Sequence, residues 1–165
     1  MITSIYLRNF KAFGSELQEI KCKPLTLIFG ENSSGKSTIL KALIALKQTI
    51  EDYDTNNVLS YQGRLVDIGP FKEFVFGHDV RKKVEIGVKW IADSFSIRED
   101  PFDFFEEFDE KIPITKSNYC TKLQYIGRTV SKKNLVLLDR AEWSCDFLED
   151  YGDKPIRFIS RLRSS

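Results

Sequence analysis

The segment from Gly30 to Ser37 constrains this chain more than any other feature. Its sequence, Gly-Glu-Asn-Ser-Ser-Gly-Lys-Ser, fits the pattern G-x-x-x-x-G-K-[ST] of a phosphate-binding loop, or P-loop. The apolar run Leu25–Phe29 precedes it, and a helical pattern begins at Lys36. A buried strand, the loop and a helix in that order are the context that this motif requires. The sequence therefore predicts a binding site for a nucleoside triphosphate.

The chemistry of the ligand explains each residue type in the loop. Glycines at positions 30 and 35 let the backbone curve closely around phosphate groups, because they lack a Cβ atom and tolerate positive φ angles. The free N–H groups at the start of the helix add the positive end of its dipole. We expect Lys36 to reach the β- and γ-phosphates as the catalytic cation, and the Ser37 hydroxyl to bind Mg²⁺. The predicted site for ATP and Mg²⁺ comprises Gly30, Glu31, Asn32, Ser33, Ser34, Gly35, Lys36, Ser37 and Thr38.

A simpler interpretation of Ser37 and Thr38 is that they form an ordinary N-cap pair. The two interpretations are compatible, because a P-loop is also a helix N-terminus.

Composition indicates one soluble domain. The chain has 165 residues and a net charge of +1, so global charge favours neither nucleic acid nor a membrane as partner. No apolar run approaches the roughly 18 residues of a membrane helix, and we expect no membrane partner. Three widely spaced cysteines and a single histidine argue against a zinc site. Free thiols suit a reducing compartment, so we expect a cytoplasmic location.

Hydrophobic periodicity divides the chain into two parts. In the first, residues 2–8 and 16–22 are expected to be strands, residues 25–29 a buried strand, and residues 36–52 a helix. A short helical turn is expected over 71–76. In the second part, alternation over 83–91, 122–130, 134–143 and 156–162 predicts an antiparallel meander. The expected fold class is α/β, with a parallel P-loop core over about 1–80 and an antiparallel β lobe over about 81–165.

Residues 98–111 interrupt the second part with seven acids and four phenylalanines. Such a segment is either a surface loop packing one apolar edge or a docking motif for a partner.

The N-terminal third resembles the opening of the ABC-type chromosome and repair ATPases, a group that includes the SMC, RecF and OLD (overcoming lysogenization defect) proteins. The resemblance rests on Ile5–Phe13, which reads Ile-Tyr-Leu-Arg-Asn-Phe-Lys-Ala-Phe, and on Leu25–Thr38 with Asn32 inside the loop. Residues Leu65–Asp79 add a more moderate likeness to OLD-like "AAA family" ATPases of bacterial anti-phage systems. This resemblance covers about residues 2–90.

The resemblance implies further site residues. In such ATPases the turn after the first strand lies near the nucleotide, so Asn9, Phe10 and Lys11 are expected to contact base or phosphate. Alternatively, Phe10 and Phe13 anchor the strand in the core. Gln62 is the candidate for the glutamine that orients Mg²⁺ and water, although its Tyr-Gln-Gly setting equally fits a turn.

The chain also departs from the family pattern. A complete head carries an LSGGQ-like signature and a strand ending in Asp-Glu (the Walker B motif), and neither is clearly present. Leu135–Asp139 has four apolar residues and an aspartate, but Arg140 follows where the catalytic glutamate belongs. A strand-end acid is the alternative interpretation of Asp139. Without a base that orients water, we expect negligible hydrolysis by this chain alone.

Two functions follow from these patterns. The first is the ATP-binding N-terminal portion of an OLD/SMC-like ATPase, whose nucleotide-driven dimerisation with a second head, identical or different, serves DNA repair or anti-phage defence. Nucleic acid or an effector nuclease is a further expected partner. The second is a non-hydrolysing ATP-binding module for regulation or interaction. A kinase or GTPase is disfavoured, since neither a base-reading Asn-Lys-x-Asp motif nor a substrate lid is seen.

Overall fold

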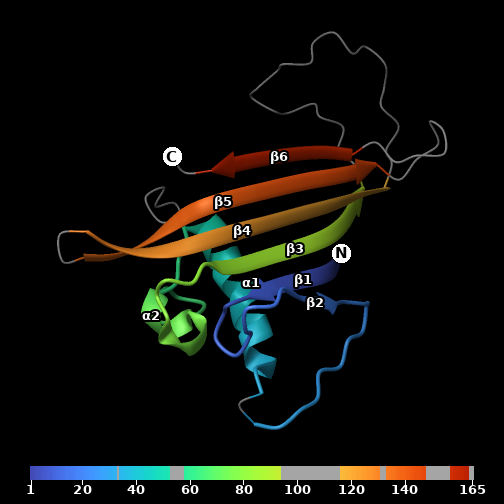
Figure 1. Ribbon diagram of the computed structural model, residues 1–165. Helices are drawn as coiled ribbons and strands as arrows, with labels where there is room; N and C mark the ends of the chain where they lie inside the picture. The colour runs from blue at the N-terminus through green and yellow to red at the C-terminus, as the bar shows by residue number, and fades with distance from the viewer. Residues whose placement is uncertain (33, 53–57, 94–115, 131–132, 148–156, 164–165) are drawn as a thin grey trace.

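The computed structural model describes residues 1–32, 34–52, 58–93, 116–130, 133–147 and 157–163. Its main feature is a six-stranded sheet with the strand order β2-β1-β3-β4-β5-β6, in which every pairing is antiparallel (Figure 1). The strands are β1 (Ile2–Arg8), β2 (Gln18–Lys21), β3 (Val84–Asp93), β4 (Lys116–Val130), β5 (Lys133–Phe147) and β6 (Arg157–Arg163). The helices are α1 (Lys36–Glu51), the short α2 (Phe71–Phe74) and the 3-10 turn η1 (Phe76–His78).

Alternating side chains give the sheet one apolar face and one polar face. Ile5 and Leu7 of β1 are buried, and so are Val84 and Ile86 of β3. Leu7 pairs with Ile86 in the register, which places the two side chains on the same face of the sheet. Tyr125 of β4 pairs with Val84 and continues the apolar face. Alternation of apolar and polar residues with a period of two therefore predicts which side chains of these strands face the core.

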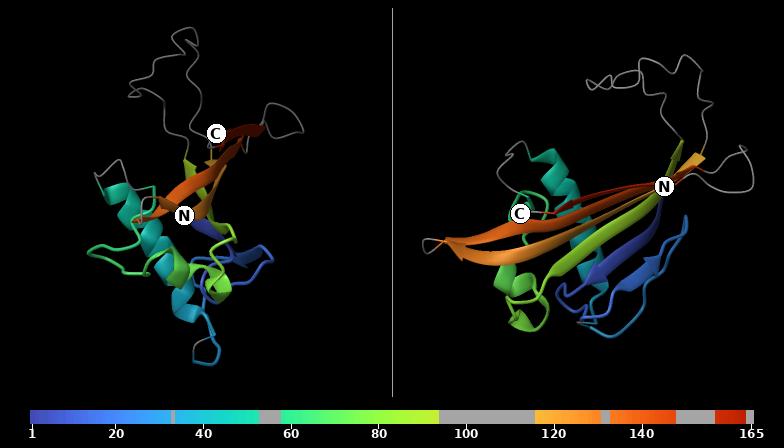
Figure 2. Two further views of the ribbon diagram at one scale, coloured as in Figure 1. Left: turned by 60° about the vertical axis from the view of Figure 1, so that its left-hand side comes forward. Right: turned by 45° about the horizontal axis from the view of Figure 1, so that its top comes forward.

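Helix α1 crosses the apolar face of the sheet (Figure 2). Its inward side consists of Ile39, Ala42 and Ala45, all buried in the same cluster as the strand residues. Residues three apart lie on one side of a helix, so this spacing directs a single stripe toward the sheet. Gln48 extends the stripe and is also buried.

Strands β4 and β5 form a long hairpin that projects past its neighbours. β3 pairs with β4 only as far as Tyr125, and β6 pairs with β5 only from Arg140 onward, whereas β4 and β5 stay paired to Val130 and Lys133. The outer part of the hairpin is therefore a two-stranded ribbon. A register shift beside Gln124 and Tyr125 marks a bulge at its base.

Helix α2 supports the ribbon from the apolar side. The ring of Phe71 lies directly on Gly127, where an added Cβ atom would stand 2.4 Å from the ring. Phe71 also packs edge-on against Phe74, with ring centroids 5.1 Å apart. The glycine allows a helix to approach the strand at a distance that no larger residue would permit.

The structure confirms most predicted elements and corrects two expectations. The strands expected over 2–8, 16–22 and 83–91, the helix over 36–52, the helical turn over 71–76 and the later meander are all present. The expected parallel core is not, because every strand pairing among the described residues is antiparallel. Residues 25–29, expected as a buried strand, belong to no sheet, and Leu25, Leu27 and Phe29 are 77%, 67% and 85% exposed.

β1 pairs directly with β3, so one sheet includes residues from both sides of position 80. The division into a P-loop core over about 1–80 and a β lobe over about 81–165 stays a prediction. Residues 98–111, with their acids and phenylalanines, lie outside the described part of the chain.

Candidate functional site: the P-loop and its supporting turn

The P-loop connects the exposed segment 25–29 to the first turn of α1. Gly35 is the N-cap of the helix and has a φ angle of +96°, a left-handed conformation that favours glycine. The amide of Thr38 donates to the Gly35 carbonyl at 3.0 Å, which starts the helix at Lys36. The chain thus turns sharply into α1 at the second glycine of the motif. Ser33, a predicted site residue, lies outside the described residues.

The Lys36 side chain lies across the loop. Its Nζ atom donates to the Gly30 carbonyl at 2.7 Å and also to the Glu31 carbonyl. The ammonium group is therefore held at the concave side of the loop by the first residues of the motif. The backbone of the P-loop therefore curves around the Lys36 ammonium group, the predicted phosphate-binding cation.

In the first turn of α1 the Thr38 amide is bonded to Gly35, which leaves the amides of Lys36 and Ser37 as the candidates to meet an anion. No side chain caps the helix, and no acidic residue lies in its first turn. The alternative interpretation of Ser37 and Thr38 as an N-cap pair is therefore wrong, because Gly35 occupies that position. Thr38 is buried, whereas Ser37 is exposed at the helix start, beside Lys36. Ser37 as the Mg²⁺ ligand stays a prediction.

The turn after β1 lies against the P-loop. Asn9 and Lys11 both have positive φ angles, 53° and 49°. The turn is fixed by backbone hydrogen bonds from Lys11 to Phe74 at 2.7 Å and from Phe76 to Asn9 at 2.9 Å. Its next residue, Ala12, touches the P-loop, since a Cβ atom on Gly35 would lie 3.0 Å from the Ala12 Cβ.

The three predicted contact residues of this turn have different environments. Phe10 is fully buried and packs against Phe74 with ring centroids 5.9 Å apart, so in this structure it anchors the turn in the core. Asn9 donates from Nδ2 to the Lys83 carbonyl at 2.9 Å, and its Oδ1 is buried without a partner among the described residues.

Lys11 is the member of the turn with the chemistry to meet a phosphate. Its Nζ donates to the Ile68 carbonyl at 2.9 Å. Burial lowers the pKa of Lys11, and the nearby Lys41 ammonium lowers it further. The carboxylates of Glu73 and Asp67 raise this pKa and so act in the opposite direction. Contact between Lys11 and nucleotide phosphate stays a prediction.

The structure does not bring Gln62 to the P-loop. Gln62 forms an isolated bridge with Asp67 and lines a hollow beside Gln48, near the C-terminal end of α1. Gln48 lies three helical turns after Ser37, which corresponds to about 16 Å along the axis. This arrangement favours the turn interpretation of Gln62 over the Mg²⁺ ligand.

The Walker B-like segment lies on β5, which pairs with β4 and β6 and not with β1. Asp139 lies in β5 and accepts a hydrogen bond from Lys83 Nζ at 2.8 Å, while Arg140 pairs with Glu142 at 2.7 Å. Two strands, β3 and β4, separate β5 from β1 in the sheet. Asp139 is thus an ion-paired acid at a bulge, in the middle of a strand rather than at its end. Within the described ranges, no group of three or more His, Cys, Asp and Glu residues is placed to hold a metal.

A curved backbone with two glycines, a lysine directed into the loop and a helix that starts behind it together define a nucleotide-binding protein of the P-loop class. Residues 1–150 match the model of the family described as "AAA ATPase domain", and the chain belongs to this family. No curated protein and no solved structure matches the chain. In the described part of the chain, no helix is both long and apolar enough to cross a membrane.

Proposed function

We propose that this chain is the ATP-binding portion of an OLD/SMC-like ATPase, acting in the cytoplasm in DNA repair or anti-phage defence. The observation that carries the proposal is the position of Lys36, whose ammonium lies inside a loop shaped by Gly30 and Gly35 at the start of α1. Membership of the AAA ATPase domain family supports ATP as the nucleotide and Mg²⁺ as its ion. The resemblance of Ile5–Phe13 and Leu25–Thr38 to ABC-type chromosome and repair ATPases supports the assignment to the OLD/SMC-like group.

The surface around the P-loop supports completion of the site by a second polypeptide segment. Leu25, Leu27 and Phe29 are exposed, and Leu40 of α1 is exposed nearby in the sequence. No backbone hydrogen bond joins residues 25–29 to the part of the chain that the structure describes. Unpaired backbone and exposed apolar side chains in one segment suit a segment that pairs with another strand. In the proposal, this segment joins the catalytic half of the ATPase, and a second head closes over the nucleotide.

Titration calorimetry with Mg-ATP tests the nucleotide site. Lys36→Ala removes a charge-assisted phosphate contact worth about 2–3 kcal/mol, so affinity should fall by roughly 30- to 150-fold. Lys47→Ala is the matched control, because Lys47 is an exposed lysine of the same helix, three turns away. Equal affinities for wild type and Lys36→Ala would refute the assignment. Titration with ADP and GTP defines phosphate number and base preference.

The metal role of Ser37 needs its own variant. Ser37→Ala keeps the loop and its lysine but removes the hydroxyl that we expect to bind Mg²⁺. The variant should bind ATP similarly without Mg²⁺ and gain less affinity than wild type when Mg²⁺ is added. An unchanged Mg²⁺ dependence would mean that another group holds the ion.

A second candidate function has its own structural support. Asp139, the residue most like a Walker B acid, is paired with Lys83 away from the P-loop. A chain with a phosphate-binding loop but no general base beside it suits an ATP-binding regulatory or interaction module that does not hydrolyse its ligand. Phosphate release measured with the second head present discriminates between the two functions.

A further inference from the structure

We propose that Lys11 is a positioning residue for the P-loop. In this role it fastens the turn after β1 to segment 59–68, and through that turn it holds Gly35 in place. The role rests on the proposed function, because a fixed curvature of the loop matters only if the loop binds phosphate. The resemblance instead makes Lys11 a direct phosphate contact. Positioning acts before any nucleotide is bound, so the two roles can be separated by experiment.

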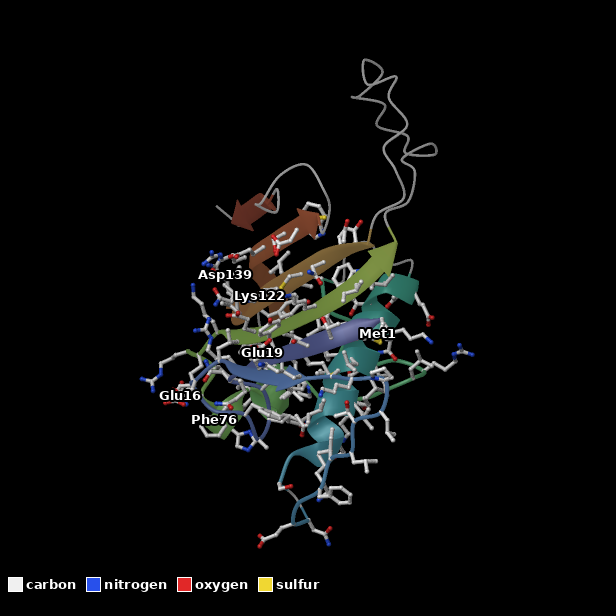
Figure 3. All side chains as sticks on the ribbon, turned by 90° about the vertical axis from the view of Figure 1, so that its right-hand side faces the viewer. Met1, Glu16, Glu19, Phe76, Lys122 and Asp139 are labelled. Carbon is white, nitrogen blue, oxygen red and sulfur yellow. The ribbon has the colours of Figure 1, made fainter. Side chains whose placement is uncertain are left out.

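The turn that contacts the P-loop has an unfavourable backbone. Asn9 and Lys11 both lie in the left-handed region, with φ angles of 53° and 49°, which is uncommon for residues that carry a Cβ atom. Such a backbone persists only where surrounding contacts hold it. Asn9 is held by its side-chain bond to the Lys83 carbonyl and by the backbone amide of Phe76, labelled in Figure 3, which donates to the Asn9 carbonyl at 2.9 Å. The side chain of Lys11 supplies the equivalent anchor for the second strained residue.

Lys11 joins the turn to α2 and to the segment before it. Its Nζ atom donates to the Ile68 carbonyl at 2.9 Å, and its backbone amide donates to the Phe74 carbonyl at 2.7 Å. The carboxylates of Glu73 and Asp67 act on the same ammonium and favour its charged form. A hydrogen bond from a charged donor is among the stronger anchors in a protein. The ammonium is therefore engaged by its own chain in the structure.

Segment 59–68 is a firm anchor, because it is bonded to α1. Ile68 is 1% exposed, so its carbonyl lies at the edge of the core. Gln48 of α1 donates to the Ser60 carbonyl at 2.8 Å and accepts hydrogen bonds from two other backbone amides of the segment. The carbonyl that Lys11 binds therefore belongs to a segment that is fixed to the P-loop helix itself.

These contacts form a closed path that includes both ends of α1. At the start of the helix, Gly35 lies against Ala12, where an added Cβ atom on Gly35 would stand 3.0 Å from the Ala12 Cβ atom. Near the end of the helix, Gln48 holds segment 59–68. Lys11 closes the path, because it precedes Ala12 in the chain and binds the last residue of the segment. Loss of its ammonium should loosen Ala12 and, with it, the left-handed turn that starts α1.

Hydrogen exchange of the nucleotide-free protein tests the positioning role. The Thr38 amide is the reporter, because it donates to the Gly35 carbonyl at 3.0 Å and is protected while that turn is formed. Lys11→Met keeps a long side chain but removes the donor, so exchange at Thr38 should become roughly tenfold faster or more. Lys11→Arg should restore most of the protection, since it supplies a charged donor.

Two comparisons make the measurement specific. Lys41→Met removes a neighbouring cation of α1 that lies outside the closed path, so its Thr38 exchange should match wild type. Amides of β3, which is paired on both sides, report global unfolding. A Thr38 rate that rises relative to the β3 rates identifies local loosening, even if Lys11→Met is less stable overall.

Unchanged Thr38 exchange in Lys11→Met, or a rise shared equally by β3, would overturn the proposal. Loss of Mg-ATP affinity in Lys11→Met with unchanged exchange would also overturn it and would establish the direct phosphate contact instead. The exchange measurement contains no nucleotide. A failure of Lys36→Ala to weaken ATP binding would therefore refute the proposed function and leave the exchange result as it is.

Discussion

The Cβ atom of Ala12 lies against Gly35, leaving only 3.0 Å for any Cβ atom at position 35. This contact joins the turn after β1 to the second glycine of the P-loop. The same turn is joined by one backbone hydrogen bond to α2 and by another to η1. The curvature of the phosphate-binding loop is therefore supported by the antiparallel sheet, through a chain of contacts that begins at the end of β1.

Gly35→Ala should disrupt the P-loop. The substitution forces an alanine to φ +96° and places its methyl group against Ala12, for a destabilisation of about 1–2 kcal/mol. ATP affinity should fall together with stability. Gly14→Ala is the control, because a Cβ atom there meets the Phe76 ring at an ordinary 3.7 Å. Urea unfolding and calorimetry measure both effects, and equal behaviour of the two variants would contradict the proposed support.

Gln48→Ala should be among the most destabilising changes in α1. The buried amide donates to the Ser60 and Val66 carbonyls and accepts from the amides of Leu65 and Val66, all within 3.2 Å. Its removal leaves buried backbone groups without partners, at a cost of about 2–3 kcal/mol. Lys47→Ala should change the free energy of unfolding by less than about 0.5 kcal/mol. A similarly small effect of Gln48→Ala would show that water replaces the amide.

Tyr6 should make stability depend on alkaline pH. Partial burial, with a hydrogen bond to Glu19 as the next cause, raises the pKa of its phenol from 10.0 to about 12. A raised folded-state pKa favours the neutral phenol, so this contribution is complete below pH 10 and is lost as pH rises through 12.

The Tyr6→Phe variant isolates this contribution. Its free energy of unfolding should fall less than that of wild type between about pH 9.5 and 11.5, by under about 1 kcal/mol, because the phenol is only partly buried and solvent screens the charge. Urea unfolding at both values gives the difference. Identical pH dependence of the two proteins would exclude Tyr6 as the group responsible.

The chain alone should release phosphate from ATP at background rate, even at concentrations that favour self-association. The acid that most resembles a Walker B residue, Asp139, is bound by Lys83 and lies two strands from β1. Asp139→Asn should leave ATP affinity unchanged and cost at most about 1 kcal/mol of stability, since it breaks one partly exposed ion pair. Turnover above background that Asp139→Asn abolishes would instead establish Leu135–Asp139 as a catalytic strand.

Sequence patterns predicted the elements that are buried against other elements of the same chain. Period-two alternation located β3 to β6, and three- and four-residue spacing located α1, because both record which side meets the core. The exposed segment 25–29 was misplaced for the same reason. Its apolar run indicates burial, but none of the described strands pairs with it, and its proposed partner strand is not part of this sheet.

For the site, motif spacing predicted the Gly35 turn and the inward position of Lys36, since both are local consequences of the loop sequence. Site residues from other parts of the chain were harder to predict. Gln62 lies at the far end of α1, and Phe10 is buried in the core, and both facts depend on tertiary packing that no motif encodes. The support of Gly35 by Ala12 was not predicted, although the small residue between Lys11 and Phe13 was a signal for it.

The openness of segment 25–29 has a consequence for handling the protein in solution. Extended backbone with free hydrogen-bonding groups and large apolar side chains pairs readily with copies of itself. Lys23 and Pro24 flank its first end and Glu31 follows the other, but residues 25–29 contain none of the charged or proline gatekeepers that natural edge strands place among their apolar residues. The exposed apolar residues of segment 25–29, which we propose pair with a partner strand, therefore also favour aggregation. Aggregation should increase with protein concentration when that partner is absent.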